Sequence, residues 1–218
     1  DKAVGAERQN RLAGPCVDLL HEAVDPEDEE LVLPVLAFPV VDAAGRPQIA
    51  YHDAAAGGIL KLARFVGSGG TGCTSSTFSG AWACDTVDDP VNAVGKFNSI
   101  AIGSDGFARI VYWDATAADM KFAQCTLPAC SGAGVTITPN VDGSANNNGR
   151  GASLALDANG NAAISYFDLT NSDLMFVKCT NAACTTQAAG TPRIIDSVVN
   201  TTTSEIQWSK IRLGSNGY

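Results

Sequence analysis

Charged residues are scarce in this chain of 218 residues, at 17% of the sequence, and most of them are acidic. The formal net charge of -9 leaves no basic stripe that could displace counterions from a phosphate backbone, which argues against nucleic-acid partners. No run approaches the roughly 18 apolar residues that cross a bilayer, so no membrane insertion is expected. The chain begins at Asp1 without a signal peptide, as a mature protein, an excised piece or an incomplete reading frame would.

Histidine is nearly absent, since only His21 and His52 occur. Two histidines offer little for a serine or cysteine triad, or for a tetrahedral zinc site. No glycine-rich phosphate loop precedes a predicted helix, so nucleotide chemistry has no support. No cofactor or metal site is therefore predicted. Calcium is compatible with the carboxylates, but no motif indicates it.

Cysteine, by contrast, is present seven times, and six of the seven fall into local pairs. Zinc binding is one explanation, but disulfides that close hairpin loops explain pairs without partner histidines better. This interpretation places the chain in an oxidising compartment, extracellular or at the cell surface. Cys16 is left over, and its partner is expected before the N-terminus. The predicted disulfides are Cys73–Cys84, Cys125–Cys130 and Cys179–Cys184.

One motif, Ile-x-Tyr-x-Asp, recurs three times, at residues 49–53, 110–114 and 164–168. In each copy a glycine precedes the tyrosine by six residues, and repetition on this scale decides the fold. The tyrosines are Tyr51, Tyr112 and Tyr166, and the glycines are Gly45, Gly106 and Gly160, with Gly217 in the same frame near the end of the chain.

Each repeat contains four short strand signals separated by turn residues. In the third repeat, alternating strands are expected over residues 152–156, 162–168, 174–179 and 192–196. Four antiparallel strands every ~50 residues predict an all-β fold of β-propeller blades, and a β-sandwich is the alternative. Propellers close with about 4–8 blades, so we expect a fragment of a larger ring. The predicted segments are 1–33 (acidic, with the last strand of a preceding blade), 34–96, 97–150 and 151–206 for repeats 1 to 3, and 207–218 for the start of a truncated fourth.

The recurring strand presents two different faces. Isoleucine and tyrosine should pack on the neighbouring blade, while the final aspartate should accept N–H groups of the next turn. A ring of these carboxylates that holds a cation or sugar hydroxyls is the alternative role. The opposite face varies, and its aromatic residues should either be buried between blades or stack on sugar rings. The ligand-binding candidates are therefore Trp113, His52, Phe167, Asp53, Asp114 and Asp168.

Residues 99–106 (SIAIGSDG) and 153–160 (SLALDANG), each followed by the tyrosine motif, resemble the tandem repeats of secreted bacterial sialidase-like propellers. The resemblance covers residues ~36–218 and extends to the Asp-box hairpins of sialidases. Asp42 and Asp157 fill the aspartate position of that hairpin, whereas Gly103 and Gly214 replace it. The resemblance implies an extracellular propeller with carbohydrate-facing or adhesive roles.

Three functions are compatible with these features. The first is a non-catalytic binding or adhesion propeller whose partner is a glycan or a cell-surface protein, next to the remaining blades. The second is a sialidase-like glycoside hydrolase, which requires an arginine cluster, a tyrosine activated by glutamate and a general acid. No glutamate lies in the repeat strands, so catalysis would depend on residues of missing blades, and a non-enzyme is favoured. The third is a purely structural module of a large secreted protein.

Overall fold

Strands dominate the computed structural model, which describes residues 40–54, 57–74, 80–90, 93–197 and 208–214. These residues belong to one unit, Ala37–Tyr218. Residues 1–33, including Cys16 and His21, and Gly217 lie outside the described residues, so the predictions for them stay predictions. Within the described ranges no helix is long and apolar enough to cross a membrane.

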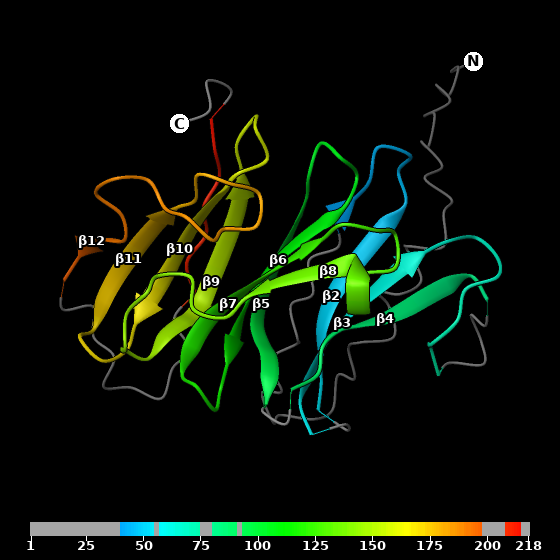
Figure 1. Cartoon of the computed structure of the whole chain (residues 1–218), viewed down its shortest axis with the longest axis horizontal. Helices are drawn as coiled ribbons and strands as arrows, with labels where there is room; N and C mark the ends of the chain where they lie inside the picture. Colours follow the sequence, from blue (N-terminus) through cyan, green and yellow to red (C-terminus); the bar gives the residue numbers. More distant parts are fainter. Residues whose placement is uncertain (1–39, 55–56, 75–79, 91–92, 198–207, 215–218) are drawn as a thin grey trace, which may run out of the picture. The chain divides into compact units, whose positions relative to one another are not determined.

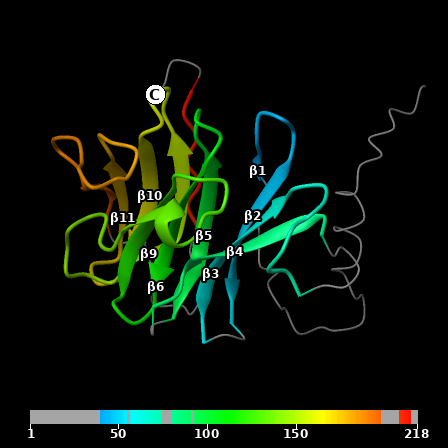
Figure 2. The same ribbon diagram turned by 45° about the vertical axis from the view of Figure 1, so that its right-hand side comes forward.

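The strands form three four-stranded antiparallel sheets, each a simple meander in chain order (Figures 1 and 2). The first sheet contains β1 (Val40–Val41), β2 (Pro47–Asp53), β3 (Ile59–Phe65) and β4 (Trp82–Asp88). The second contains β5 (Val94–Ile102), β6 (Ala108–Asp114), β7 (Asp119–Cys125) and β8 (Val135–Thr138), with the 3-10 turn η2 (Gly132–Gly134) before β8. The third contains β9 (Asn148–Leu156), β10 (Ala162–Asp168), β11 (Asp173–Lys178) and β12 (Arg193–Asp196).

The prediction of an all-β chain built from four-stranded antiparallel units is confirmed by these sheets. Three sheets, rather than the two of a sandwich, are formed by the part of the chain that the structure describes. These three sheets do not close a ring (Figure 1).

The turn between the first two strands of a sheet is held by an aspartate. Asp42 Oδ1 accepts the N–H groups of Ala44 and Arg46, and Asp157 Oδ1 accepts those of Asn159 and Asn161. In the second sheet Gly103 takes the aspartate position, and Asp105 caps the turn instead. A Cβ at Gly103 would lie 2.6 Å from Asp105 Oδ1, so an aspartate at position 103 and the cap formed by Asp105 exclude each other.

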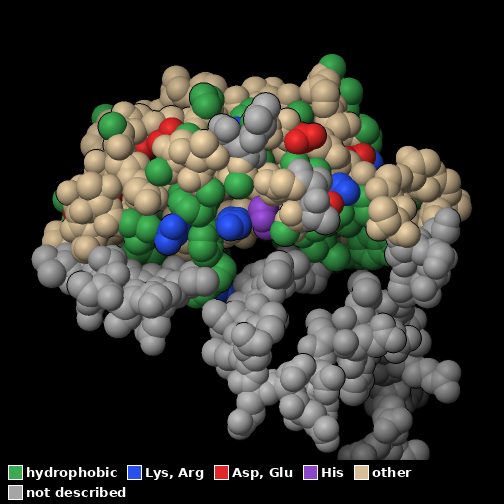
Figure 3. Space-filling view, turned by 90° about the horizontal axis from the view of Figure 1, so that it is seen from below, with side chains coloured by type: hydrophobic (Ala, Val, Ile, Leu, Met, Phe, Trp, Pro, Cys, Tyr) green, Lys and Arg blue, Asp and Glu red, His purple; other side chains and the backbone are tan. Residues whose placement is uncertain are grey.

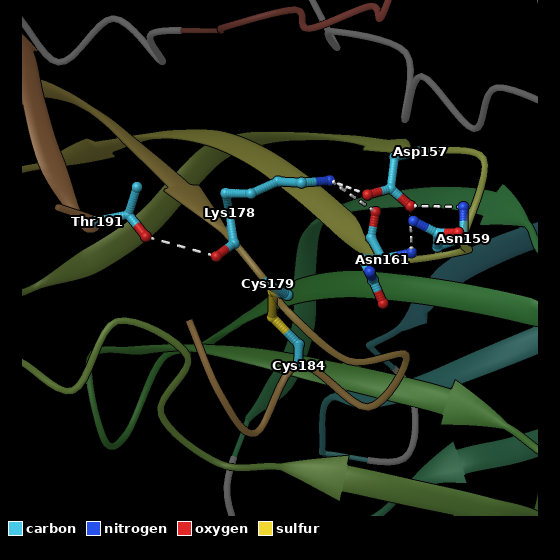
Figure 4. A network of polar contacts seen from close by, with 7 residues as sticks. All are labelled: Asp157, Asn159, Asn161, Lys178, Cys179, Cys184 and Thr191. Carbon is cyan, nitrogen blue, oxygen red and sulfur yellow. Dashed lines mark hydrogen bonds and ion pairs between the residues drawn. A yellow bond between two sulfur atoms is a disulfide. The ribbon is translucent and has the colours of Figure 1, made fainter. Parts of the chain in front are cut away.

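In the third sheet this turn is also tied to the next strand. Lys178 Nζ lies 2.6 Å from Asp157 Oδ2, directly before the Cys179–Cys184 disulfide (Figure 4). Burial alone would raise the pKa of Asp157, but the Lys178 ammonium and the backbone N–H groups outweigh it and hold the pKa below its ordinary value.

Three disulfides close the loops that follow the third strand of each sheet. They join Cys73 to Cys84, Cys125 to Cys130 and Cys179 to Cys184, with Cα atoms 4.9–5.0 Å apart. Three such bonds indicate an oxidising, extracellular environment.

Hydrophobic side chains fill both spaces between consecutive sheets. One cluster joins the first two sheets through Leu60, Leu62 and Ile110, and another joins the second and third sheets through Phe122 and Leu154. The middle sheet therefore has two buried faces, and neighbouring residues of β6 point into different clusters.

The first strand of a sheet crosses the preceding sheet so closely that two positions require glycine. A Cβ on Gly95 would lie 2.9 Å from Leu60 Cα, and one on Gly149 would lie 2.7 Å from Met120 Cβ. Both glycines also have positive φ, at 95° and 98°. At these positions the backbone of β5 touches β3 and that of β9 touches β7, while β5 also lies against β2 and β9 against β6.

Each gap between sheets also contains a hydrogen bond from a motif tyrosine to an aspartate 24 residues earlier. Tyr112 Oη donates to Asp88 Oδ2 over 2.6 Å, and Tyr166 Oη donates to Asp142 Oδ2 over 3.0 Å. Both tyrosines are fully buried. Lys121 Nζ, at 2.6 Å, adds an ion pair to Asp88. The recurring tyrosine thus joins its sheet to the one before it.

We expect Tyr112→Phe and Asp88→Ala each to lower the free energy of unfolding, by about 1.5–3 kcal/mol, because each removes one partner of a partly buried hydrogen bond to a charged group. Because both changes remove the same contact, the double variant should lose clearly less than the sum of the two. Urea denaturation of the four proteins measures this coupling. Strictly additive losses would show that the contact contributes nothing to stability.

The Asp157 turn should make stability depend on acid. A carboxylate with a lowered pKa stabilises the fold above its ordinary pKa, and that contribution disappears as the pH falls through the native value. The stability difference between the wild type and Asp157→Asn, followed by urea denaturation, should therefore shrink below about pH 4. Lys178→Met should weaken the same dependence. A difference that grows in acid would contradict this assignment.

Candidate functional site

Two of the three predicted carboxylates, Asp114 and Asp168, cap the turns after the second strands of their sheets, whereas Asp53 lies 3.1 Å from Lys61 Nζ. Asp114 and Asp168 are each 3% exposed. Asp114 Oδ1 accepts the N–H groups of Thr116 and Ala117, and Asp168 Oδ1 accepts those of Thr170 and Asn171. Among the residues that the structure describes, no three His, Cys, Asp or Glu side chains gather in a way that could hold a metal ion. The geometry thus favours the turn-capping role over a cation-holding ring.

The predicted aromatic candidates do not form an open stacking surface. Trp113 is 6% exposed and Phe167 is 8% exposed, so of the two environments expected from the sequence, both rings have the buried one in this structure. For Trp113 the physical reason is that its strand, β6, belongs to a sheet covered on both faces. His52 is half-buried, and its Nδ1 lies 2.8 Å from the carbonyl oxygen of Val94, in the neighbouring sheet.

Trp113 instead forms the buried wall of a cluster that we call the Arg150 cluster: Phe97, Trp113, Arg150 and Trp208. The Arg150 guanidinium lies 4.3 Å from the centroid of the Trp113 ring and 5.8 Å from that of Phe97. Phe97 in turn contacts Trp113 and Trp208, with ring centroids 5.7 and 5.8 Å apart. Trp208 is 47% exposed, so the cluster reaches the surface through this ring.

A distortion of β5 places Phe97 in this cluster. Phe97 has a φ of 52°, and the pairing of β5 with β6 shifts register between Lys96 and Ser99. Asn98 Nδ2 donates to the carbonyl oxygen of Gly95 and holds the bulge. Bulges redirect side chains next to functional sites, and a strained non-glycine residue is a candidate for a functional position.

Trp208 reaches the cluster because residues 208–214 lie along β9. The Ser209 N–H donates to the Gly151 carbonyl oxygen, and the Ile211 N–H donates to Ser153 Oγ. β9 makes the equivalent contact one sheet earlier, where the Leu154 N–H donates to Ser99 Oγ. This segment thus packs on the third sheet as β9 packs on the second.

The cluster contains hydrogen-bonding groups that other described residues do not satisfy. Trp113 Nε1 and Arg150 Nε are buried without a hydrogen-bond partner, and Arg150 forms no ion pair within the described ranges. Buried donors normally find partners, because an unpaired one costs about 1–3 kcal/mol. A cationic group against aromatic rings is suited to an anionic or hydroxyl-rich ligand.

Figure 3 shows Lys and Arg side chains among hydrophobic ones on the face seen from below.

Sequence reasoning missed three members of this cluster, because Phe97, Arg150 and Trp208 lie outside the tyrosine motif. A weaker signal was available. Gly95-Lys96 and Gly149-Arg150 occupy corresponding places at the start of β5 and β9, so a basic residue follows the crossing glycine in both sheets.

The two tryptophans of the cluster should respond differently to truncation. Trp113→Ala should cost about 3–5 kcal/mol of unfolding free energy because it leaves a buried cavity. Trp208→Ala should cost about 0.5 kcal/mol, as expected at an exposed site. Chemical denaturation with the disulfides intact measures both. A loss below 1 kcal/mol for Trp113→Ala would show that this ring is not part of the core.

Compared with protein-family models and with curated proteins, the sequence matches none of either. Inferences about function therefore rest on the geometry of the described residues.

Proposed function

We propose that this chain is part of an extracellular β-propeller that binds glycans without catalysis. The observation that carries the proposal is the Arg150 cluster, which combines an exposed indole with a guanidinium that lacks an anionic partner within the described ranges. An indole face stacks on sugar rings, and a guanidinium binds carboxylates and hydroxyl groups. An acidic glycan fits both features.

The propeller is supported by the way in which successive sheets are added. Each four-stranded meander places its first strand on the preceding sheet, and residues 208–214 repeat that contact on the third. The last strand of the third sheet carries exposed hydrophobic side chains, since Ile194 and Ile195 of β12 are 54% and 53% exposed. Further blades of a larger ring would cover such surfaces.

Catalysis of the sialidase type is not favoured by the motif tyrosines. Burial, together with the charge of a neighbouring aspartate, raises the pKa of the Tyr112 and Tyr166 hydroxyl groups. A nucleophilic tyrosine requires the opposite shift, towards the phenolate. The three disulfides support the extracellular location.

A glycan array probed with the folded, disulfide-intact chain tests this proposal. Arg150→Met and Trp208→Ala should each weaken binding by about tenfold, equal to ~1.4 kcal/mol, because each removes one recognition element. Arg193→Met is the matched control, since Arg193 also lies over an aromatic ring, that of Phe176, but outside the cluster. Binding should survive a calcium chelator.

Two outcomes would contradict the proposal. Equal losses for Arg150→Met and Arg193→Met would place the binding surface elsewhere. No binding to any glycan by a protein shown to be folded would favour the purely structural module.

A further inference from the structure

A second polar site lies on the face of the first sheet that points away from the second sheet. Tyr51 and Lys61 are directly opposite each other on β2 and β3, as Tyr112 and Lys121 are on β6 and β7. Cross-strand partners share one face of a sheet, so each pair presents a phenol and an ammonium group together.

The pair in the second sheet shows what this arrangement binds. Tyr112 Oη and Lys121 Nζ both lie 2.6 Å from the same oxygen, Asp88 Oδ2 of the preceding sheet. Lys121 is 3.8 Å from Asp114, the aspartate of its own motif, so the incoming carboxylate is its main partner. One phenol and one ammonium group thus bind one carboxylate oxygen.

The pair in the first sheet has the same groups in an open setting. Tyr51 and Lys61 line a pocket of about 390 Å³, whose wall includes residues 72–74 and the Cys73–Cys84 disulfide. Lys61 Nζ lies 3.1 Å from Asp53, its own motif aspartate. Within the described ranges, no carboxylate reaches the Tyr51 hydroxyl as Asp88 reaches that of Tyr112. Burial raises the pKa of Tyr51, so the phenol remains a donor at neutral pH.

We propose that Tyr51 and Lys61 form a carboxylate-binding site whose ligand is an aspartate or glutamate side chain of a polypeptide. A polypeptide is favoured as the ligand because Tyr112 and Tyr166, at the equivalent positions, both bind an aspartate side chain of the chain itself. Each of these aspartates follows a buried valine, in Val87-Asp88 and Val141-Asp142. The site is separate from the Arg150 cluster and does not depend on its ligand. The sequence contains two more Val-Asp pairs before the first sheet, Val17-Asp18 and Val24-Asp25, both outside the described residues.

Zero-length crosslinking with a water-soluble carbodiimide tests the site on the full, disulfide-intact chain. The reagent activates a carboxylate, the Lys61 amine displaces the activating group to form an amide, and the carbodiimide takes up the lost oxygen as a urea. Mass spectrometry of the digest then identifies the carboxylate. The Lys121–Asp88 crosslink, from a pair 2.6 Å apart, is the internal control.

We expect Lys61 to be joined to an aspartate or glutamate other than Asp53. Tyr51→Phe should lower the yield of that crosslink about tenfold, because it removes one of the two bonds to the carboxylate, and should leave the Lys121–Asp88 yield unchanged. A mixture of isotope-labelled and unlabelled chains distinguishes the sources, since mixed crosslinks arise only between two copies. Crosslinks from Lys61 to Asp53 alone, or a yield independent of Tyr51, would overturn the proposal.

Discussion

The close crossing of one sheet by the first strand of the next is the constraint on which the structure depends. A four-stranded meander this small cannot bury a face by itself, so its hydrophobic side chains must be covered by another sheet. Gly95 and Gly149 allow the next sheet to approach closely, because any side chain there would meet the backbone or Cβ of Leu60 or Met120. The two hydrophobic clusters, the bulge at Phe97 and the placement of Arg150 all follow from this approach.

The two aspartates between sheets, Asp88 and Asp142, show how such a contact tolerates variation. Asp88 is held by a tyrosine and a lysine, whereas Met175 takes the place of the lysine in the third sheet. There Asp142 accepts a hydrogen bond from Asn148 Nδ2 in addition to that from Tyr166. A carboxylate taken out of water needs at least two donors, and the sequence supplies the second one from different strands. The tyrosine is the constant partner, which is why the motif recurs as tyrosine rather than phenylalanine.

Much of the repeat was predictable from the sequence, because the four-strand pattern and the turn chemistry are local signals. The strand that carries Tyr112 and the caps formed by Asp114 and Asp157 follow from alternation and turn propensity. For Trp113 the sequence left burial and an open stacking surface as alternatives, since alternation separates two faces but does not say whether both are covered. Phe97 and Trp208 were missed for a different reason: a bulge and a segment without regular strand pairing carry no periodic signal.

The same repeat residues have different environments at the ends of the row of sheets and within it. The hydrophobic residue before the inter-sheet aspartate is 4% exposed at Val87 and fully buried at Val141, but the corresponding Ile195 is 53% exposed. Tyr51 differs from Tyr112 and Tyr166 in the same way, being only half-buried. Since the residue types are preserved, the difference comes from the neighbour and not from the repeat itself. A repeat position that is buried between two sheets in the middle of the row is therefore exposed at the end of the row, where it can contact a ligand. Tyr51 with Lys61 is the exposed pair whose chemistry is defined, because the buried pair Tyr112 and Lys121 binds a carboxylate.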